Sequence, residues 1–275
     1  MAEENRERLE EYMAAFNQPQ STLALDQGDY ANTGFTQWGA SGLAVAWAEE
    51  NTRDSIFKAF KRKETFATTG TRLAVRFFGG YELSSIDLNS DTMVADAYKN
   101  GVTMGADLLS DGDKVPEFIV WAQKDKYGAP LQRVQIIKGW MDSLSGRPNE
   151  KVFDVVCSDG NTVDPVTHRC PDNGAKVNIN DCSISQNVGS SELKTHWIDP
   201  EFDSSNKAFY YVRVLENPTC RWSTWDAVKR GFKPREDLHE TIQERAWSSP
   251  IWYIPDPSDV EVIPLGGTVR LRSST

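Results

Sequence analysis

From residue 71 onward, apolar residues recur in short runs rich in β-branched and aromatic side chains, separated by Gly, Pro, Asn or Asp. Such runs are typical of strands, and the separating residues are typical of turns. Strands are predicted at residues 72–78, 117–123, 131–138, 151–156, 207–215, 260–263 and 268–273. Short helices are predicted at 92–99, ending near Gly101, and at 224–229, ending at Gly231. This pattern favours an antiparallel sandwich.

The amino-terminal part of the chain follows a different pattern. Helical spacing of apolar residues predicts a helix over residues 3–16, and a short apolar run predicts a strand over 43–47. Asn51 or Thr52 can cap a helix that follows this strand, and residues 72–78 are expected to return as the next strand. The order strand, helix, strand is typical of an α/β barrel, in which the carboxyl ends of the strands face the active site.

The turn after the strand at 43–47 carries candidate site residues. Glu49 and Glu50 could line a substrate pocket as acid/base groups or as groups that support a metal site, and Arg53 could bind a phosphate or carboxylate. The alternative is an ordinary helix start with acidic residues at its positive end. For this chain alone the second interpretation is favoured, because the opposing wall of a barrel pocket is missing.

Lys138 and Trp140 form a second candidate pair. They stand at the end of a predicted strand, where an ammonium group and an indole could contact a ligand. A tryptophan in such a position more often covers the edge of a hydrophobic core.

Several segments resemble one bacterial family, and they are spread along most of the chain from about residue 36. They lie at residues 47–53, 66–70, 76–80, 101–108, 136–140, 209–226 and 241–253. The family is catalogued as domain of unknown function 3604 and is related to the polymerase and histidinol phosphatase (PHP) superfamily of metal-dependent hydrolases. The resemblance implies an α+β fold class: residues 1–70 would be the end of a PHP-like α/β barrel, and 71–275 a mainly antiparallel β-sandwich-like domain with a Cys-containing loop.

The resemblance also implies that a catalytic part is absent. Members of that family are longer, and their amino-terminal half carries the His and Asp motifs of a metal site. The histidines here, His168, His196 and His239, stand in no His-x-His, Asp-x-His or His-Glu-x-x-His motif. We therefore assign no metal ligand, no catalytic residue and no cofactor to this chain, and expect a divalent metal in the full-length parent.

The expected function follows from that interpretation. The chain would be the carboxy-terminal part of a PHP-like hydrolase, a phosphoesterase by analogy with the superfamily, with little or no turnover alone. Its expected partner is the missing amino-terminal barrel half or another copy of the chain. The alternative is a non-catalytic β-sandwich that serves as a binding or structural module.

Charge and hydropathy exclude some classes of function. The formal net charge of -10 disfavours binding to nucleic acid or to anionic membranes, which both need a dense basic surface. No apolar stretch approaches the roughly 20 residues of a membrane-spanning helix. The acidic start of the sequence is unlike a signal peptide, and we interpret it as an internal start within a longer parent.

Cys157, Cys170, Cys182 and Cys220 point to an oxidising compartment, because three of them lie in a polar, Gly- and Pro-rich stretch that could bury little apolar area. Pairs 157–170 and 182–220 are the arrangement considered first, and the other connectivities remain open. A four-thiolate zinc site is the less favoured alternative, because the spacings between the cysteines are all long. Disulfides would imply that the parent is exported to the periplasm or beyond.

Overall fold

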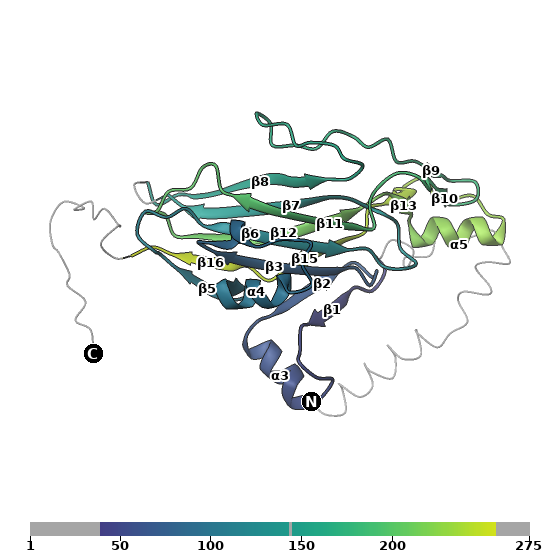
Figure 1. Cartoon of the computed structure of the whole chain (residues 1–275). Helices are drawn as coiled ribbons and strands as arrows, with labels where there is room; N and C mark the ends of the chain where they lie inside the picture. The colour runs from purple at the N-terminus through teal and green to yellow at the C-terminus, as the bar shows by residue number, and fades with distance from the viewer. Residues whose placement is uncertain (1–38, 143–144, 257–275) are drawn as a thin grey trace, which may run out of the picture. The chain divides into compact units, whose positions relative to one another are not determined.

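The computed structural model describes residues 39–142 and 145–256. The helix predicted at 3–16 and the strands predicted at 260–263 and 268–273 lie outside the described residues. Figure 1 shows the described strands and helices in chain order.

The chain divides into two compact units. Of the described residues, the larger one, here called the sandwich unit, comprises 41–142, 145–178, 183–219 and 242–256. The smaller one comprises 39–40, 179–182 and 220–241. The domain boundary predicted between residues 70 and 71 stays a prediction.

An eight-stranded sheet dominates the sandwich unit. Along its main path the order is β1 (Leu43–Ala46), β2 (Thr65–Thr68), β15 (Arg245–Ser248), β12 (Ala208–Glu216), β16 (Ile251–Ile254) and β5 (Asp107–Leu109). β15 and β16 pair with successive parts of one edge of β12. β7 (Leu131–Met141) pairs with the other edge, and β8 (Pro148–Cys157) pairs with β7. All these pairings are antiparallel except that of β16 with β5.

A second sheet has four antiparallel strands in the order β11 (Glu192–Ile198), β6 (Glu117–Gln123), β3 (Ala74–Gly80) and β4 (Gly101–Thr103). The short 3-10 helix η3 (Leu83–Ser85) and helix α4 (Met93–Asn100) pack against it, in a cluster that includes Phe78 and Ile119. There are also two small hairpin-like sheets, β9 (Val177–Asn178) with β10 (Ser183–Ile184) and β13 (Thr219–Cys220) with β14 (Thr241–Ile242).

One hydrophobic core joins the two large sheets. Phe77 of β3 and Phe118 of β6 share this core with Ile136 of β7 and with Tyr210 and Val212 of β12. Alternate residues of each strand point into it, as the two-residue period of a strand requires. Each fully buried side chain of this size contributes about 1.5–3 kcal/mol, so this core is the main source of stability. The predicted antiparallel, β-rich α+β architecture is confirmed at this level.

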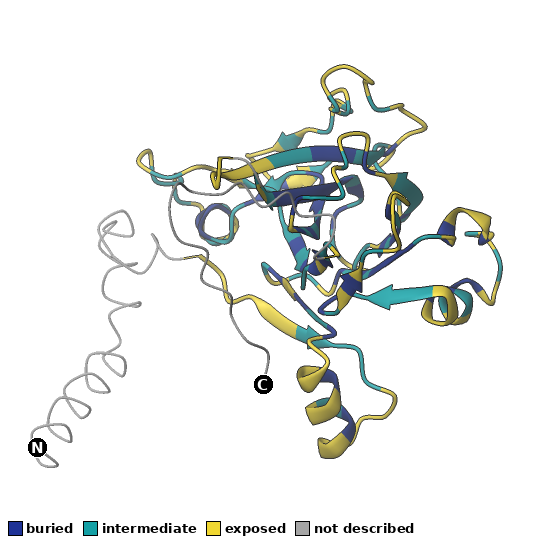
Figure 2. Ribbon diagram, turned by 90° about the vertical axis from the view of Figure 1, so that its left-hand side faces the viewer, coloured by how far each residue is buried: buried dark blue, intermediate teal, exposed yellow. Residues whose placement is uncertain are grey.

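Several predicted elements are confirmed with small shifts at their ends. The strand predicted at 117–123 is β6, and that at 131–138 is the start of the longer β7. Helix α3 (Arg53–Lys61) begins after Thr52, whose Oγ1 accepts a hydrogen bond from the Ser55 N–H. Most of its residues face solvent, as Figure 2 shows for the helix at the bottom of the view.

The partial α/β barrel expected over residues 1–70 is not confirmed, and the described residues form no closed barrel. Parallel strands are required for such a barrel. Instead, β2 follows α3 and pairs antiparallel with β1, within the large sheet. The strand expected to return at 72–78 is β3, which belongs to the other sheet. No strand was predicted from the sequence at β2.

The smaller unit contains helix α5 (Trp222–Arg230). Gly231 ends this helix with φ 72°, the left-handed conformation that glycine adopts without steric cost. The prediction that the helix stops at Gly231 is confirmed.

All four cysteines form disulfides, Cys157 with Cys170 and Cys182 with Cys220. This is the pairing considered first from the sequence, and it leaves none of these thiols for the alternative zinc site. The first bridge holds the loop after β8, and the second lies in the smaller unit. Bridges of this kind stabilise mainly by restricting the unfolded chain, by roughly 3–4 kcal/mol for loops of these lengths.

Candidate functional site

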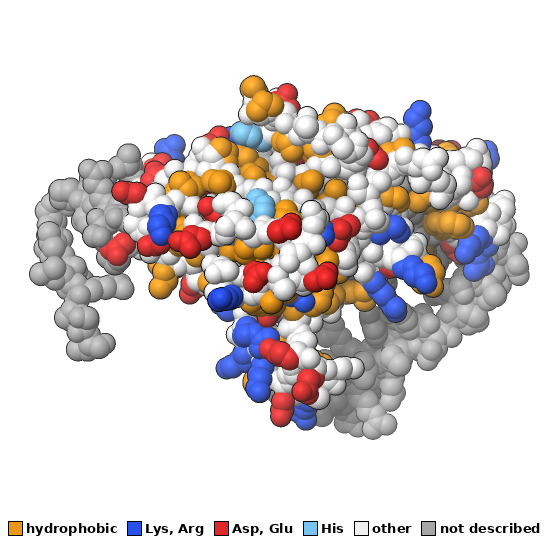
Figure 3. Space-filling view, in the orientation of Figure 1, with side chains coloured by type: hydrophobic (Ala, Val, Ile, Leu, Met, Phe, Trp, Pro, Cys, Tyr) orange, Lys and Arg blue, Asp and Glu red, His pale blue; other side chains and the backbone are white. Residues whose placement is uncertain are grey.

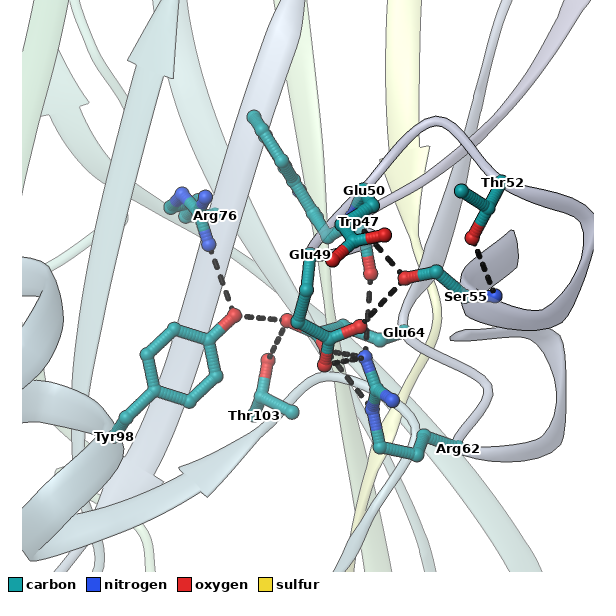
Figure 4. Close-up of polar contacts among 10 residues, drawn as sticks. All are labelled: Trp47, Glu49, Glu50, Thr52, Ser55, Arg62, Glu64, Arg76, Tyr98 and Thr103. Atoms are coloured by element: carbon teal, nitrogen blue, oxygen red, sulfur yellow. Dashed lines mark hydrogen bonds and ion pairs between the residues drawn. The ribbon is translucent and has the colours of Figure 1, made fainter. Parts of the chain in front are cut away.

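The turn between β1 and α3 places Glu49 and Glu50 at the start of the helix (Figure 4). The Ser55 hydroxyl donates to Glu49 Oε2 at 2.9 Å, and the Glu50 N–H donates to Ser55 Oγ at 3.1 Å. Hydrogen bonds from its own backbone N–H and from Ser55 lower the pKa of the Glu49 carboxyl. These contacts match the capping interpretation, in which acidic groups accept hydrogen bonds at the positive end of a helix.

Arg53, the predicted anion ligand of this turn, is exposed at the first position of α3. The cation that contacts Glu49 is instead Arg62, one residue past the end of α3, at 3.0 Å. The structure therefore brings Glu49 and Glu50 together at the helix start and places Arg53 outside their network.

Arg62 connects this turn to a buried carboxylate, Glu64, which is 2% exposed. Arg62 Nη2 lies 3.3 Å from Glu64 Oε2. The hydroxyls of Tyr98 and Thr103 donate to Glu64 Oε1, the latter at 3.3 Å. Three partners from α4, β4 and the end of α3 thus compensate the removal of this carboxylate from water (Figure 4).

The backbone next to Glu64 explains how the carboxylate is held. Lys63 adopts φ 57°, which turns the chain sharply between α3 and β2. Gly105 packs directly on this turn, and a Cβ at that position would lie 2.2 Å from the Lys63 carbonyl oxygen. The close approach brings Thr103, two residues earlier, into contact with Glu64.

Arg76 of β3 extends the network. Its guanidinium carbon lies 3.8 Å from the centroid of the Trp47 ring, and Nη1 donates to the Tyr98 hydroxyl at 3.0 Å. Trp47 is fixed in turn, because its indole N–H donates to the Val75 carbonyl at 2.9 Å. Burial, followed by the hydrogen bond to Glu64, raises the pKa of Tyr98. Tyr98 therefore stays a neutral phenol that accepts from Arg76 and donates to Glu64.

A pocket of about 220 Å³ lies beside Arg76 on the outer face of the four-stranded sheet, and Trp47, Trp121, Gln123 and Val94 of α4 line it. The indole N–H of Trp121 donates to Glu192 at 2.5 Å. Among the ion pairs of the described residues, none involves Arg76. The pocket therefore combines two aromatic walls with a guanidinium that no carboxylate neutralises directly, an arrangement suited to a small anionic group.

Lys138 and Trp140 lie in another part of the sandwich unit, on β7. Lys138 is 4% exposed, its Nζ lies 2.5 Å from Asp199 Oδ2, and it donates to the Glu201 carbonyl at 2.7 Å. Trp140 is partly buried against the core, with its ring 5.0 Å from Lys138 Nζ. Lys138 is thus committed to an internal ion pair.

Sequence reasoning missed Glu64, Arg76 and Tyr98. Arg76 occupies the outward position between the buried residues Val75 and Phe77, which in a sequence is typical of any solvated strand face. Arg76 lies in β3 of the four-stranded sheet and Trp47 directly follows β1 of the other large sheet, so no local spacing could have identified their stacking.

Two absences bear on wider function. Within residues 39–142 and 145–256, no three His, Cys, Asp or Glu side chains lie close enough together to hold a metal ion. No helix in the same ranges is long and apolar enough to cross a membrane.

Comparison with known proteins gave one match. Residues 4–255 match the family described as "Protein of unknown function (DUF3604)". Searches of the curated proteins and of the solved structures found no match.

Proposed function

The chain belongs to the DUF3604 family, and we propose that it is the carboxy-terminal portion of a PHP-like metal-dependent hydrolase in which Arg76 binds the anionic group of a phosphoester substrate. The resemblance of its sequence segments to PHP-related proteins supports the reaction class. The pocket beside Arg76 supports a role in substrate recognition. The observation that carries the proposal is the guanidinium of Arg76, 3.8 Å from the Trp47 ring and paired with no carboxylate among the described residues.

The chemistry of Arg76 suits a phosphoryl group. A guanidinium presents donors in a planar fork that matches two oxygens of a phosphate, and it stacks on aromatic rings without losing these donors. Trp47 and Trp121 line the pocket with aromatic rings. The volume of about 220 Å³ is below the range of about 300–1,000 Å³ typical of sites for larger ligands, so the pocket would hold a single small group.

Glu64 and Tyr98 act as positioning residues in this proposal. Tyr98 accepts one hydrogen bond from Arg76 and donates its own proton to Glu64 in another, so the guanidinium keeps a fixed orientation over Trp47. The described residues do not fit a metal site. The metal ligands of the parent are therefore proposed to come from outside them, either from an amino-terminal barrel half or from another copy of the chain.

A binding experiment tests the role of Arg76. Titration of the full chain with phenyl phosphate, followed by tryptophan fluorescence, is expected to show saturable binding that weakens with salt. Arg76→Ala should lose at least 10-fold in affinity, and Arg76→Lys should lose nearly as much because an ammonium cannot form the planar fork.

Arg53→Ala is the matched control, since it removes an exposed arginine from the same region. The proposed role of Arg76 is wrong if the native chain does not bind phenyl phosphate, or if Arg76→Ala binds it as tightly as Arg53→Ala.

A second experiment tests the hydrolase assignment. The DNA immediately upstream of Met1 would be sequenced, and any longer in-frame protein would be assayed with p-nitrophenyl phosphate and Mn²⁺. We expect upstream His and Asp motifs and turnover by the longer protein, with little or none by the present chain. An in-frame stop codon without such motifs would overturn the hydrolase assignment.

A non-catalytic binding or structural module is the second candidate. It is favoured by the single core that joins the two large sheets, because such a core can fold without a barrel partner. This candidate gains support if the chain binds phenyl phosphate while the longer reading frame is absent.

The two disulfides suit an oxidising compartment, since thiols are kept reduced in the cytosol of most organisms. We accordingly propose an exported parent protein that acts in the periplasm or outside the cell.

A further inference from the structure

A groove of about 450 Å³ lies where β7 ends and β8 begins, and it also borders β12 and β16. Phe209 and Trp252, which line it, alternate along their strands with the core residues Tyr210 and Ile251. The groove therefore lies on the outer face of the eight-stranded sheet. The Arg76 pocket is on the outer face of the other sheet, so a ligand of the groove is independent of the proposed function.

Four groove residues form one row across four neighbouring strands. Trp252 lies opposite Phe209, Phe209 opposite Gly139, and Gly139 opposite Glu150. Because strands are spaced about 4.8 Å apart, the row extends about 14 Å, which is the length of a short chain molecule and more than a single small ring requires.

Aromatic rings form the floor of this row. The centroids of the Phe209 and Trp252 rings are 5.2 Å apart. The Phe209 ring lies over Gly139, where an added Cβ would approach the ring to 2.2 Å, so only glycine allows the ring to cover β7. Trp252 is 37% exposed, and Phe209 is partly exposed. The floor is an apolar surface of two rings inclined at 53° to each other, and it remains accessible to a ligand.

Charged groups stand at the rim. Glu150 and Lys207 are both exposed lining residues, and neither belongs to an ion pair within the described part of the chain. On the molecular face drawn in Figure 3, charged side chains of both signs lie among hydrophobic ones.

The aromatic floor and the two oppositely charged rim groups together indicate the chemistry of the ligand. A wholly apolar ligand would displace the water that solvates Glu150 and Lys207, and it could not replace the hydrogen bonds that this water makes with them. A ligand with one net charge would be attracted by one rim group and repelled by the other. A neutral ligand rich in hydroxyls can donate to the carboxylate and accept from the ammonium, while its apolar C–H faces lie on the rings.

We propose that this groove binds a neutral oligosaccharide, with its sugar rings stacked on Phe209 and Trp252 and its hydroxyls bonded to Glu150 and Lys207. The volume of about 450 Å³ lies within the usual range for ligand sites. The site would hold the protein on a glycan surface.

Affinity electrophoresis of the full chain tests this directly. The native chain would be run in gels that contain soluble β-glucan, xylan or galactomannan, and its mobility compared with that in a gel without polysaccharide. We expect at least one of these polymers to retard it. Trp252→Ala should weaken that binding at least 10-fold, and the double variant Glu150→Gln with Lys207→Met should weaken it at least 3-fold.

Trp225→Ala is the matched control, because Trp225 is 39% exposed and lies on α5 in the smaller unit. It should bind as the native chain does. The double variant keeps the test valid if Trp252→Ala does not fold, since both rim residues are exposed. The proposal is overturned if none of the three polysaccharides retards the native chain, or if Trp225→Ala and the groove variants lose binding equally.

Discussion

Glu64 and Glu216 are two glutamates that the sandwich unit withdraws almost completely from water, and their surroundings differ. Glu64 is 2% exposed and Glu216 is 0% exposed. The Glu64 carboxylate contacts Arg62 and two hydroxyl groups. Neither carboxyl oxygen of Glu216 has a hydrogen-bond partner among the described residues.

The strand backbone accounts for the burial of Glu216. Its N–H donates to the Glu244 carbonyl at 2.9 Å, and its own carbonyl accepts from the Gln243 side chain at 3.2 Å. The side chain packs against Gly128, where a Cβ would lie 3.2 Å from Oε1. Hydrogen bonds of the main chain therefore hold Glu216 in place, while its carboxyl group has no hydrogen-bond donor among the described residues.

The buried position of Glu216 changes the pKa of its carboxyl group. Burial, together with the nearby Glu244 and Asp125 carboxylates, raises the pKa of Glu216 to about 7. The buried Thr71 hydroxyl lies close enough to oppose this rise, although it forms no hydrogen bond within the described residues. Equal burial can therefore surround one carboxyl group with hydrogen-bonding partners, as at Glu64, and leave another without any among the described residues, as at Glu216, where it favours the neutral form.

Lys138 and Asp199 are buried charged groups that do have partners. They form an ion pair in which both side chains are buried. Asp199 also accepts hydrogen bonds from the Tyr210 hydroxyl at 2.8 Å and from the Glu201 N–H at 2.9 Å. Burial is the main cause that raises the pKa of Tyr210.

Removal of one member of this pair should give the largest effect. Asp199→Ala leaves the Lys138 ammonium buried without a counter-charge, and we expect a loss of about 3–5 kcal/mol in the free energy of unfolding. The double variant Lys138→Met with Asp199→Leu should lose much less, because no buried charge remains. Urea denaturation measures both, and equal losses would contradict the assignment of the cost to the unpaired charge.

Glu216→Gln should act in the opposite direction and depend on pH. Because the folded pKa of about 7 exceeds the unfolded value, the folded state retains a proton that the unfolded state releases between about pH 4.5 and 7. The contribution of Glu216 to stability is therefore full below pH 4.5 and is lost as pH rises through 7, by up to about 3 kcal/mol. Glutamine does not ionise, so the variant should be more stable than the native chain at pH 8 and similar at pH 4.5.

Denaturant unfolding from pH 4.5 to 8 tests this expectation, with the exposed Glu236→Gln as control. A constant difference between Glu216→Gln and the native chain over this range would show that Glu216 does not titrate there.

Glu64→Ala should cost about 2 kcal/mol, because the Tyr98 and Thr103 hydroxyls lose their acceptor and a buried cavity is left. The expected loss in the free energy of unfolding is smaller than for a fully buried ion pair, because the Arg62 side chain is 39% exposed. Glu49→Ala is the matched control, since Glu49 contacts the same arginine but its side chain is 65% exposed. If Glu64→Ala and Glu49→Ala shift the denaturation midpoint alike, the buried contacts of Glu64 do not stabilise the fold as expected.

Thr52→Ala should give the smallest effect. It removes the side-chain acceptor of the Ser55 N–H at the start of α3 and should cost about 1 kcal/mol. Hydrogen exchange of the amides in α3 measures it, and Asn51→Ala serves as control because the structure selects Thr52 between the two predicted caps. Faster exchange in the Asn51 variant alone would contradict this assignment.

Much of the fold could be predicted from local signals. The strand at 117–123, the start of α3 after Thr52 and the end of α5 at Gly231 each depend on a few neighbouring residues. β2, β15 and β16, with four residues each, were not predicted, and neither was the seven-residue β11. The candidate site was located only in part: Glu49 and Glu50 were identified, but the stacked pair of Trp47 and Arg76 requires knowledge of which strands become neighbours.

The sequence by itself indicated the β-rich class, a cap for α3 at Asn51 or Thr52, the end of α5 at Gly231 and the family, because these follow from residue types along the chain. It favoured the disulfide pairs 157–170 and 182–220 but left the other connectivities open, and the structure decided between them. Tertiary structure alone decided that β1 and β2 pair antiparallel within the large sheet, that Lys138 is bound to Asp199, and that Glu216 is buried without a partner. The physical reason is that charge and hydrogen bonding depend on contacts in space. Those contacts join residues that the linear pattern leaves unrelated.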